Sequence, residues 1–191
     1  MIRHGETDWN YFGRIQGSTD IPLNDRGRAQ ARSVAQYLGR EHWHSIYSSP
    51  LSRAFDTATA IAGETGIPDI VTDPRLQERD FGEAEGMEVA MRGEVYGNGP
   101  IPGAETREDV QVRALEVIQH IALREEGRRT IAVAHGGFIS AILSLLSDGK
   151  IVPGNPPLKN TCMNLLSYDG TWHIEWYNRV TPELEAISAK K

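Results

Sequence analysis

The feature that most constrains the fold is an uninterrupted apolar segment, residues 130–134, which ends at His135 and two glycines. An apolar run without alternation is typical of a strand that is covered on both faces, as central strands of parallel sheets are. Apolar residues at helical spacing over residues 110–121 precede this strand, and residues 138–146 after it are also predicted to be helical. The segment therefore predicts a helix–strand–helix unit of an α/β domain.

The first half of the chain repeats this alternation. A helix is predicted over residues 24–39, and a strand over residues 45–49. Ser49 is expected to cap the next helix, with Pro50 at its first position, and that helix runs toward Gly66.

The second half adds two further local signals. Thr106 and Asp109 have the spacing of a capping box at the start of the helix that contains residues 110–121. Residues 162–178 alternate around an Asp-Gly pair and predict a β-hairpin. No linker that would divide the chain is apparent. The nearest candidate, residues 97–103, is rich in glycine and proline and is expected to form a surface loop.

Alternating helices and strands that end in a hairpin predict a three-layer α/β/α sandwich, with helices on both faces of a mixed, mostly parallel sheet. A single domain over residues 1–191 is expected from the length. Ligands of such folds bind at the carboxyl ends of strands, so His4, His135 and residues 49–53 are expected at one edge. The first strand would be very short, because two residues precede Arg3.

Composition excludes several classes of function. Lys and Arg number 20 and Asp and Glu 26, so the net charge of −6 argues against a basic nucleic-acid surface but permits a local anion site. The one cysteine, Cys162, allows neither an internal disulfide nor a cysteine-based zinc cluster. No apolar run is long enough for a membrane span and no signal-peptide pattern is seen, so a soluble cytoplasmic protein is expected.

Two arginines carry the first indication of chemistry. Arg3 precedes His4 and a glycine, which combines a planar fork of donors, a neutral imidazole and a close approach of the backbone to a ligand. Arg53 is expected in the first turn of a helix, where a cation is unfavourable unless it shares an anionic ligand with the helix N-terminus. These residues predict a phosphate or similar anion site.

Together with further motifs, these residues resemble the histidine phosphatase superfamily, in its phosphoglycerate-mutase-like branch. The tripeptide Arg3-His4-Gly5 alone is unspecific, but all of the motifs occur in the family's order from residue 3 to residue 137. The matching stretches are residues 3–10, 16–17, 22–23 and 27, 48–58, 76–86 and 134–137.

The resemblance implies a metal-independent reaction with no cofactor. His4 would attack phosphorus and become a phosphohistidine, which water then hydrolyses. Arg3, Arg53 and His135 would surround the transferred phosphoryl group, and Glu78 would serve as general acid and then as base. Further substrate contacts are expected from four residues at the pocket edge: Asn10, Gln16, Gly17 and Gly136.

The resemblance leaves phosphatase and mutase activity open, because both use the same phosphohistidine. Mutases of the family carry a long insertion with basic residues after the Glu78 motif, whereas residues 87–105 are few and contain Arg92 but no lysine. Gln16 also resembles phosphatase members. We therefore favour a phosphomonoesterase that acts on a small phosphorylated metabolite, with a cofactor-dependent phosphoglycerate mutase and a non-enzymatic phospholigand-binding protein as alternatives.

The leaving-group side of the pocket is expected to be partly apolar, and Arg79 or Arg92 could reach its mouth. Neither a nucleic acid nor a membrane is expected as a partner. Members of the family are often dimers, which leaves a homodimer open, although no feature of the sequence indicates one. The leaving-group wall is expected to contain five large side chains: Tyr11, Phe12, Phe81, Met87 and Tyr96.

Overall fold

The computed structural model describes residues 1–97 and 99–183. Its centre is a six-stranded sheet in the order β3-β2-β4-β1-β5-β6. The strands β3, β2, β4 and β1 run parallel to one another, whereas β5 is antiparallel to β1 and β6 to β5. Their bounds are β1 Ile2–Arg3, β2 Ser45–Ser48, β3 Ile70–Thr72, β4 Thr130–Ala134, β5 Met163–Tyr168 and β6 Trp172–Arg179.

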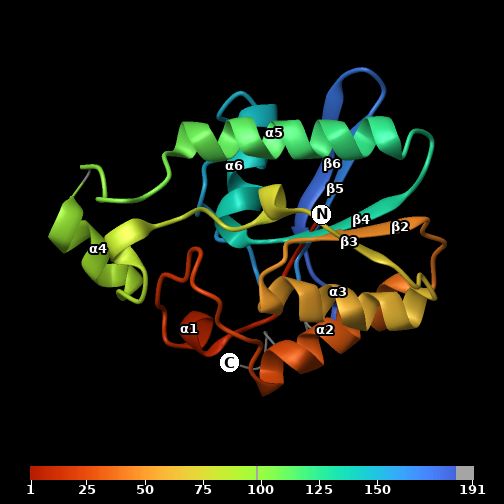
Figure 1. The fold of residues 1–191 in the computed structure, drawn as a ribbon, viewed down its shortest axis with the longest axis horizontal. Helices are drawn as coiled ribbons and strands as arrows, with labels where there is room; N and C mark the ends of the chain where they lie inside the picture. Colours follow the sequence, from red (N-terminus) through yellow and green to blue (C-terminus); the bar gives the residue numbers. More distant parts are fainter. Residues whose placement is uncertain (98, 184–191) are drawn as a thin grey trace.

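Helices cover both faces of this sheet (Figure 1). One face carries α2 (Asp25–Leu38) and α3 (Ser52–Thr65), and the other carries α5 (Arg107–Arg124) and α6 (Gly136–Leu146). The predicted three-layer α/β/α sandwich, with a mixed and mostly parallel sheet, is confirmed. Two short helices, α1 (Asp8–Tyr11) and α4 (Val89–Tyr96), lie beyond one end of the layers, at the left in Figure 1.

The strand β4 shows why its apolar run is continuous. Ile131 and Val133 pack into the core beneath α2 and α3, whereas Ala132 and Ala134 pack into the core beneath α5 and α6. Side chains of a strand alternate between the two faces of a sheet, and both faces of this one are covered. The strand β4 pairs with β1 on one side and with β2 on the other, so it lies in the interior of the sheet between these two strands.

Two helices away from the pocket have side-chain caps, one of which was predicted. The Asn24 side chain accepts a hydrogen bond from the backbone N–H of Gly27 at the start of α2. Thr106 and Asp109 form the predicted capping box of α5, with side chain and backbone bonded in both directions. Each cap satisfies backbone donors that the first turn of a helix leaves without an intrahelical partner.

The prediction that Ser49 caps the following helix is wrong. The helix α3 begins at Ser52, and its N-cap Leu51 makes no side-chain capping bond; the N–H of Ser52 instead donates to Asp20 Oδ1 at 2.9 Å. The Ser49 hydroxyl instead lies against His135, a contact between segments that a local pattern cannot reveal. Arg53 nevertheless occupies the first turn of α3, as expected.

Several elements were not expected from the sequence. These are the edge strand β3 and the helices α1 and α4, whose segments are too short or too weakly patterned for a prediction. The hairpin of β5 and β6 pairs Tyr168 with Trp172, so its loop has three residues rather than an Asp-Gly pair alone. Residues 76–86 look irregular in the sequence. In the structure this segment contains the 3₁₀ turn η2 (Gly82–Ala84), and another 3₁₀ turn, η1 (Pro74–Leu76), ends at its first residue. Position 98 of the predicted loop lies outside the described residues.

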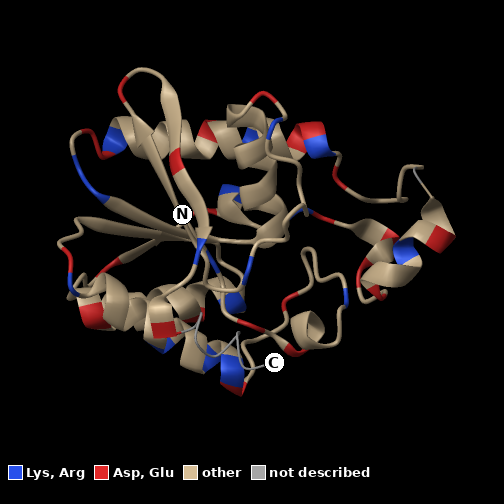
Figure 2. Cartoon of the chain, turned by 180° about the vertical axis from the view of Figure 1, so that it is seen from behind, with Lys and Arg blue, Asp and Glu red and all other residues tan. Residues whose placement is uncertain are grey.

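Positions of Lys and Arg are interspersed with positions of Asp and Glu along the helices (Figure 2). No helix within residues 1–97 and 99–183 has the length and apolar character needed to cross a membrane.

We expect Thr106→Ala to lower the free energy of unfolding by about 1 kcal/mol, because the backbone N–H of Asp109 in the first turn of α5 loses the hydroxyl that caps it. Urea denaturation would measure the change. Thr106→Ser keeps the hydroxyl and should stay close to the wild type. An unchanged free energy in Thr106→Ala would show that the capping box does not stabilise the helix.

Candidate active site

A pocket of about 340 Å³ lies at the carboxyl ends of the parallel strands. His4 follows β1, His135 follows β4, and Arg53 lies in the first turn of the helix after β2. Of the nine site residues expected from the sequence, His135 alone is not part of the pocket wall; it is fully buried, and its ring centroid lies 5.1 Å from that of His4. The other eight line the pocket: Arg3, His4, Asn10, Gln16, Gly17, Arg53, Glu78 and Gly136.

The protonation of His4 follows from its contacts. Its Nδ1 lies 2.6 Å from the backbone carbonyl of Gly5, and because a carbonyl oxygen only accepts, Nδ1 must carry the proton. Burial, with the nearby charges of Arg3 and Arg53, lowers the pKa of His4 well below its usual 6.5. The ring is therefore neutral at pH 7, and Nε2 has a free lone pair.

The half-buried Arg3 and the fully buried Arg53 are anchored by backbone carbonyls rather than by carboxylates. Arg53, which is fully buried, donates to the carbonyl oxygens of Thr19 at 2.9 Å and Gly17 at 2.7 Å. Arg3 donates through Nη1 to the carbonyl of Leu158. Burial lowers the pKa of both guanidinium groups, and carbonyl dipoles leave their positive charges unneutralised. Such groups favour an anion beside them.

Three buried nitrogens of the site have no hydrogen-bond partner among the described residues: Arg3 Nε, Arg53 Nε and His135 Nδ1. Buried polar atoms in proteins are almost always satisfied, so a group of orphaned nitrogens indicates an acceptor that the chain itself does not provide. Both arginine Nε atoms are donors at every pH. A tetrahedral oxyanion offers several oxygens at once and matches this arrangement.

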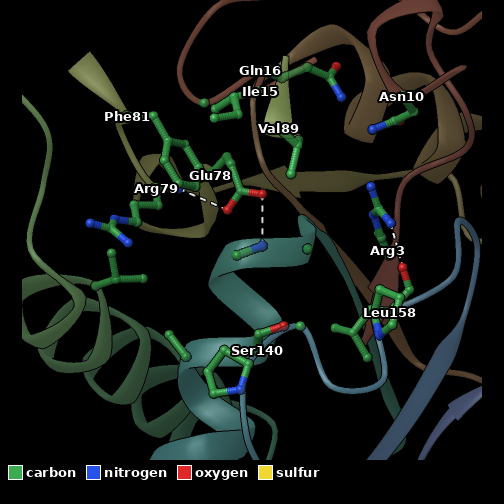
Figure 3. Close-up of a pocket in the computed structure, with 18 of the residues that line it drawn as sticks. Arg3, Asn10, Ile15, Gln16, Glu78, Arg79, Phe81, Val89, Ser140 and Leu158 are labelled. Atoms are coloured by element: carbon green, nitrogen blue, oxygen red, sulfur yellow. Dashed lines mark hydrogen bonds between the residues drawn. The ribbon is translucent and has the colours of Figure 1, made fainter. Parts of the chain in front are cut away.

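Glu78 connects the pocket to the N-terminus of α6 (Figure 3). Its Oε2 accepts from the Gly137 N–H at 2.9 Å, and its Oε1 accepts from the N–H groups of Phe138 at 2.8 Å and Arg79 at 2.9 Å. A carboxylate at this position complements the positive end of the helix dipole. A Cβ on Gly137 would lie 2.7 Å from Glu78 Oε1, so glycine is required for this approach.

Gly17 holds the loop opposite Arg53 in a conformation that needs glycine. Its φ is +59°, and a Cβ there would lie 1.9 Å from Glu85 Oε1. Glu85 accepts hydrogen bonds from the N–H groups of Ser18 at 2.7 Å and Thr19 at 2.9 Å. Although burial opposes it, these hydrogen bonds lower the pKa of Glu85 below its usual value. This carboxylate, whose role the sequence did not reveal, fixes the carbonyls that hold Arg53.

Asn10 and Gln16 lie on the same side of the pocket (Figure 3). Asn10 Oδ1 accepts from the Thr7 N–H at 3.2 Å and from Asn160 Nδ2 at 3.1 Å. Gln16 Oε1 accepts from the Thr7 hydroxyl at 2.9 Å. Both side chains therefore brace the loop, and the amide nitrogen of each is the end that remains for a ligand.

The expected leaving-group wall is mostly wrong. Phe81 lines the pocket, but the other four large side chains, Tyr11, Phe12, Met87 and Tyr96, are absent from the lining formed by the described residues. Tyr11 and Phe12 are exposed and contact each other edge to face, and Tyr96 packs on a small separate core near α4. The apolar lining instead includes Ile15, Val89, Val110, Pro153, Pro157 and Leu158.

Three further arginines line the pocket: Arg14, Arg79 and Arg107. Arg79 donates to the Glu105 carbonyl at 2.8 Å and lies over the Phe81 ring at 5.0 Å. Burial, followed by the nearby charges of Arg92 and Arg107, lowers the pKa of Arg79. Within residues 1–97 and 99–183, no carboxylate forms a salt bridge with Arg14, Arg79 or Arg107. Arg92, which the sequence suggested near the mouth, is not among the lining residues.

The pocket thus combines five arginines with a single carboxylate, that of Glu78. This charge is opposite to the net charge of −6 of the whole chain, so the attraction for anions is local. No group of three or more His, Cys, Asp and Glu side chains that could hold a metal ion is found in the described part of the chain.

Comparisons with known proteins point to one family. The family model of the histidine phosphatase superfamily, branch 1, matches residues 1–180. The uncharacterized phosphatase PhoE of Bacillus subtilis is 36% identical over 179 residues, which cover 93% of this chain and 92% of that protein. The 2,3-bisphosphoglycerate-dependent phosphoglycerate mutase 2 of Gloeobacter violaceus is 33% identical over 158 residues, which cover 75% of this chain and 72% of that protein.

A solved structure agrees with the described fold. The mycobacterial glucosyl-3-phosphoglycerate phosphatase, determined as a complex with VO3, superimposes with a TM-score of 0.83 and 31% sequence identity. The similarity covers 93% of this chain and 96% of that chain. Relatives named as phosphatases and as mutases thus share the fold and most of the length of this chain.

The depressed pKa values of His4 and His135 predict an acid-sensitive stability. Below about pH 6.5 the unfolded chain takes up protons on these imidazoles that the folded chain excludes. Their contribution to stability is therefore complete above pH 6.5 and falls as the pH drops toward the folded pKa values. The slope reaches about 1.4 kcal/mol per pH unit for each histidine.

Urea denaturation at pH 7.5, 6.5 and 5.5 in phosphate-free buffer would measure this slope. His135→Gln should show a shallower decline than the wild type, because one buried imidazole is gone. His120→Gln, at an exposed position on α5, serves as the control and should keep the wild-type slope. Equal slopes in His135→Gln and the wild type would contradict the prediction.

Proposed function

The chain belongs to branch 1 of the histidine phosphatase superfamily, and on this premise we propose that it is a phosphomonoesterase that forms a phosphohistidine on His4. One observation carries the assignment to this site: a neutral imidazole with a free Nε2 lies among three buried nitrogens that lack an acceptor. The substrate is a small phosphorylated metabolite. The family match to residues 1–180 supports a single domain over residues 1–191.

The reaction proceeds in two displacements. In the first, the lone pair of His4 Nε2 attacks phosphorus in line, and the bond from phosphorus to the leaving oxygen breaks while Glu78 gives that oxygen a proton. In the second, Glu78 takes a proton from water, whose oxygen attacks phosphorus, and the bond from phosphorus to Nε2 breaks. Inorganic phosphate leaves, and His4 returns to its neutral form.

Charge on the phosphoryl oxygens is offset by groups that the fold has already fixed. Arg3 and Arg53 are held by backbone carbonyls, so their Nε donors need little reorganisation when the transition state forms. Asn10, Gln16, Gly17 and Gly136 complete the substrate contacts at the pocket edge.

Glu78 can carry the required proton without leaving its place. Each carboxylate oxygen has two lone pairs, and Oε2 accepts one hydrogen bond, from the Gly137 N–H. The second lone pair of Oε2 is available for a proton while the backbone contacts of Oε1 keep the group in position.

A phosphoglycerate mutase is the alternative, because some relatives carry that name. The few residues between Gly86 and Thr106 and the presence of Gln16 favour the phosphatase. Incubation with 3-phosphoglycerate separates the two: a phosphatase releases inorganic phosphate, whereas a mutase forms the 2-isomer at a rate that rises with added bisphosphoglycerate. A cytoplasmic location remains a prediction from the sequence, and a homodimer is left open by the resemblance to the family.

The outer arginines suggest a class of leaving group. Arg3 and Arg53 suffice for the phosphoryl group, so Arg14, Arg79 and Arg107 are available to a second negative charge on the same substrate. The mycobacterial relative is named for glucosyl-3-phosphoglycerate, which carries a carboxylate beside its phosphate position. We therefore assign to this chain a phosphorylated acid as its substrate class.

We expect His4→Ala to reduce phosphate release from p-nitrophenyl phosphate to the background rate, because the Nε2 atom that forms the proposed covalent intermediate is removed. Rapid quenching at alkaline pH and mass spectrometry of the His4 peptide should detect the phosphohistidine in the wild type. His42→Ala, at an exposed position away from the pocket, should retain full activity. Substantial turnover by His4→Ala, or loss of wild-type turnover in EDTA, would overturn the mechanism.

We also expect kcat/KM for 3-phosphoglycerate to exceed that for glycerol 3-phosphate by roughly tenfold, which corresponds to about 1.4 kcal/mol of transition-state stabilisation. The two esters differ in a carboxylate that replaces an alcohol. Arg79→Gln and Arg107→Gln should reduce this preference and leave glycerol 3-phosphate turnover nearly unchanged. Arg40→Gln, on the distant surface after α2, is the matched control. Equal kcat/KM values for both esters would refute the substrate class but not the phosphatase.

A further inference from the structure

Ser49 is a fully buried residue at the carboxyl end of β2, and its hydroxyl makes two contacts. The backbone N–H of Leu51 donates to Ser49 Oγ at 3.3 Å. The same Oγ lies 2.8 Å from His135 Nε2, on a strand-to-helix junction 86 residues away in the sequence. The two junctions that carry Arg53 and His135 are thus joined by one side-chain contact.

The direction of the Ser49–His135 hydrogen bond follows from counting donors. A hydroxyl has one proton to donate and two lone pairs, and one lone pair of Ser49 already accepts from Leu51. If Nε2 donated to Oγ, the hydroxyl proton would have no acceptor among the described residues. If the hydroxyl donates to Nε2, every polar atom of Ser49 is satisfied, which is the rule for buried groups.

We propose that Ser49 is a positioning residue that holds His135 in the tautomer with the proton on Nδ1. The hydroxyl donates to the Nε2 lone pair, and the single proton of the ring is then on the other nitrogen. This nitrogen is the one without a partner among the described residues.

The neutral state of His135 supports this picture. Its burial, followed by the neighbouring charge of Arg53, lowers its pKa well below 6.5, so the ring carries one proton at neutral pH and has a definite tautomer. In the opposite tautomer, Nδ1 would present a lone pair to the oxygens of a phosphoryl group, and the interaction would be repulsive. In the proposed tautomer, Nδ1–H donates to one of those oxygens.

This consequence for the reaction rests on the proposed function, whereas the tautomer itself does not. Removal of the Ser49 hydroxyl leaves Nε2 without a donor and allows the ring proton to occupy either nitrogen. In the molecules whose ring proton is on Nε2, the phosphoryl group then faces the lone pair of His135 Nδ1. The loss falls on the transition state, in which negative charge on the oxygens is offset, more than on substrate binding.

Long-range ¹H–¹⁵N correlation spectra of ¹⁵N-labelled protein test the tautomer directly. The spectra are recorded at pH 7.5 without phosphate, and the His135 signals are assigned by their absence in His135→Gln. We expect the wild type to show Nδ1 protonated and Nε2 unprotonated, and Ser49→Ala to show a mixture or the opposite tautomer. A wild-type ring with its proton on Nε2, or an unchanged tautomer in Ser49→Ala, overturns the proposal.

Steady-state kinetics with p-nitrophenyl phosphate give the second measurement. Ser49→Ala should lower kcat roughly 10- to 100-fold, the range found when an orienting partner of a functional histidine is removed from a metal site, with KM changed much less. Ser48→Ala is the matched control, because Ser48 is an equally buried neighbour whose hydroxyl donates to the Ser49 carbonyl. Equal kcat losses in both variants would indicate a packing effect and overturn the positioning role.

The two measurements separate the failures. If the folded wild type releases no phosphate from any ester, the proposed function fails, and the spectra still decide the tautomer. If the wild type is active but Ser49→Ala keeps its kcat, the positioning role fails and the phosphatase stands.

Discussion

The hydrogen bonds from the buried Arg53 guanidinium to the carbonyls of Gly17 and Thr19 are the interaction on which the pocket depends. A charge without solvent costs free energy, and carbonyl dipoles reduce that cost without cancelling the charge. The loop that supplies the carbonyls requires a positive φ at Gly17 and the carboxylate of Glu85. An unneutralised cation is thereby held ready for a phosphate ester.

The same burial determines the state of the two histidines. Desolvation and the nearby arginines disfavour a further positive charge, so both imidazoles stay neutral at pH 7. A neutral ring has one protonated nitrogen, and its partner selects which one. The Gly5 carbonyl selects Nδ1 as the donor in His4, and our assignment gives Ser49 the corresponding role for His135. Burial of charge and control of tautomers are thus two results of one desolvated environment.

The pocket also resolves a contrast in charge. A chain with a net charge of −6 repels anionic metabolites at long range, yet five arginines and one carboxylate line its pocket. Electrostatic attraction is confined to short distances, where solvent screening is weakest. Such a distribution favours ligands small enough to enter the pocket over extended polyanions, which the net negative charge of the chain repels.

The sequence by itself determined the layers of the fold, since the apolar run of β4 and the helical spacing around it leave little choice. Its local motifs, through their resemblance to the histidine phosphatase superfamily, also implied His4, Arg53, Glu78 and His135 as candidates. Only the tertiary structure decided that Ser49 contacts His135 instead of capping α3. It also decided that Arg14 and Arg107 line the pocket, and that Ile15 and Val89 are among the apolar side chains found there in place of most of the expected leaving-group wall. The physical reason is that hydrogen bonds and pocket walls join residues distant in sequence, whereas periodicity and capping patterns describe neighbours along the chain.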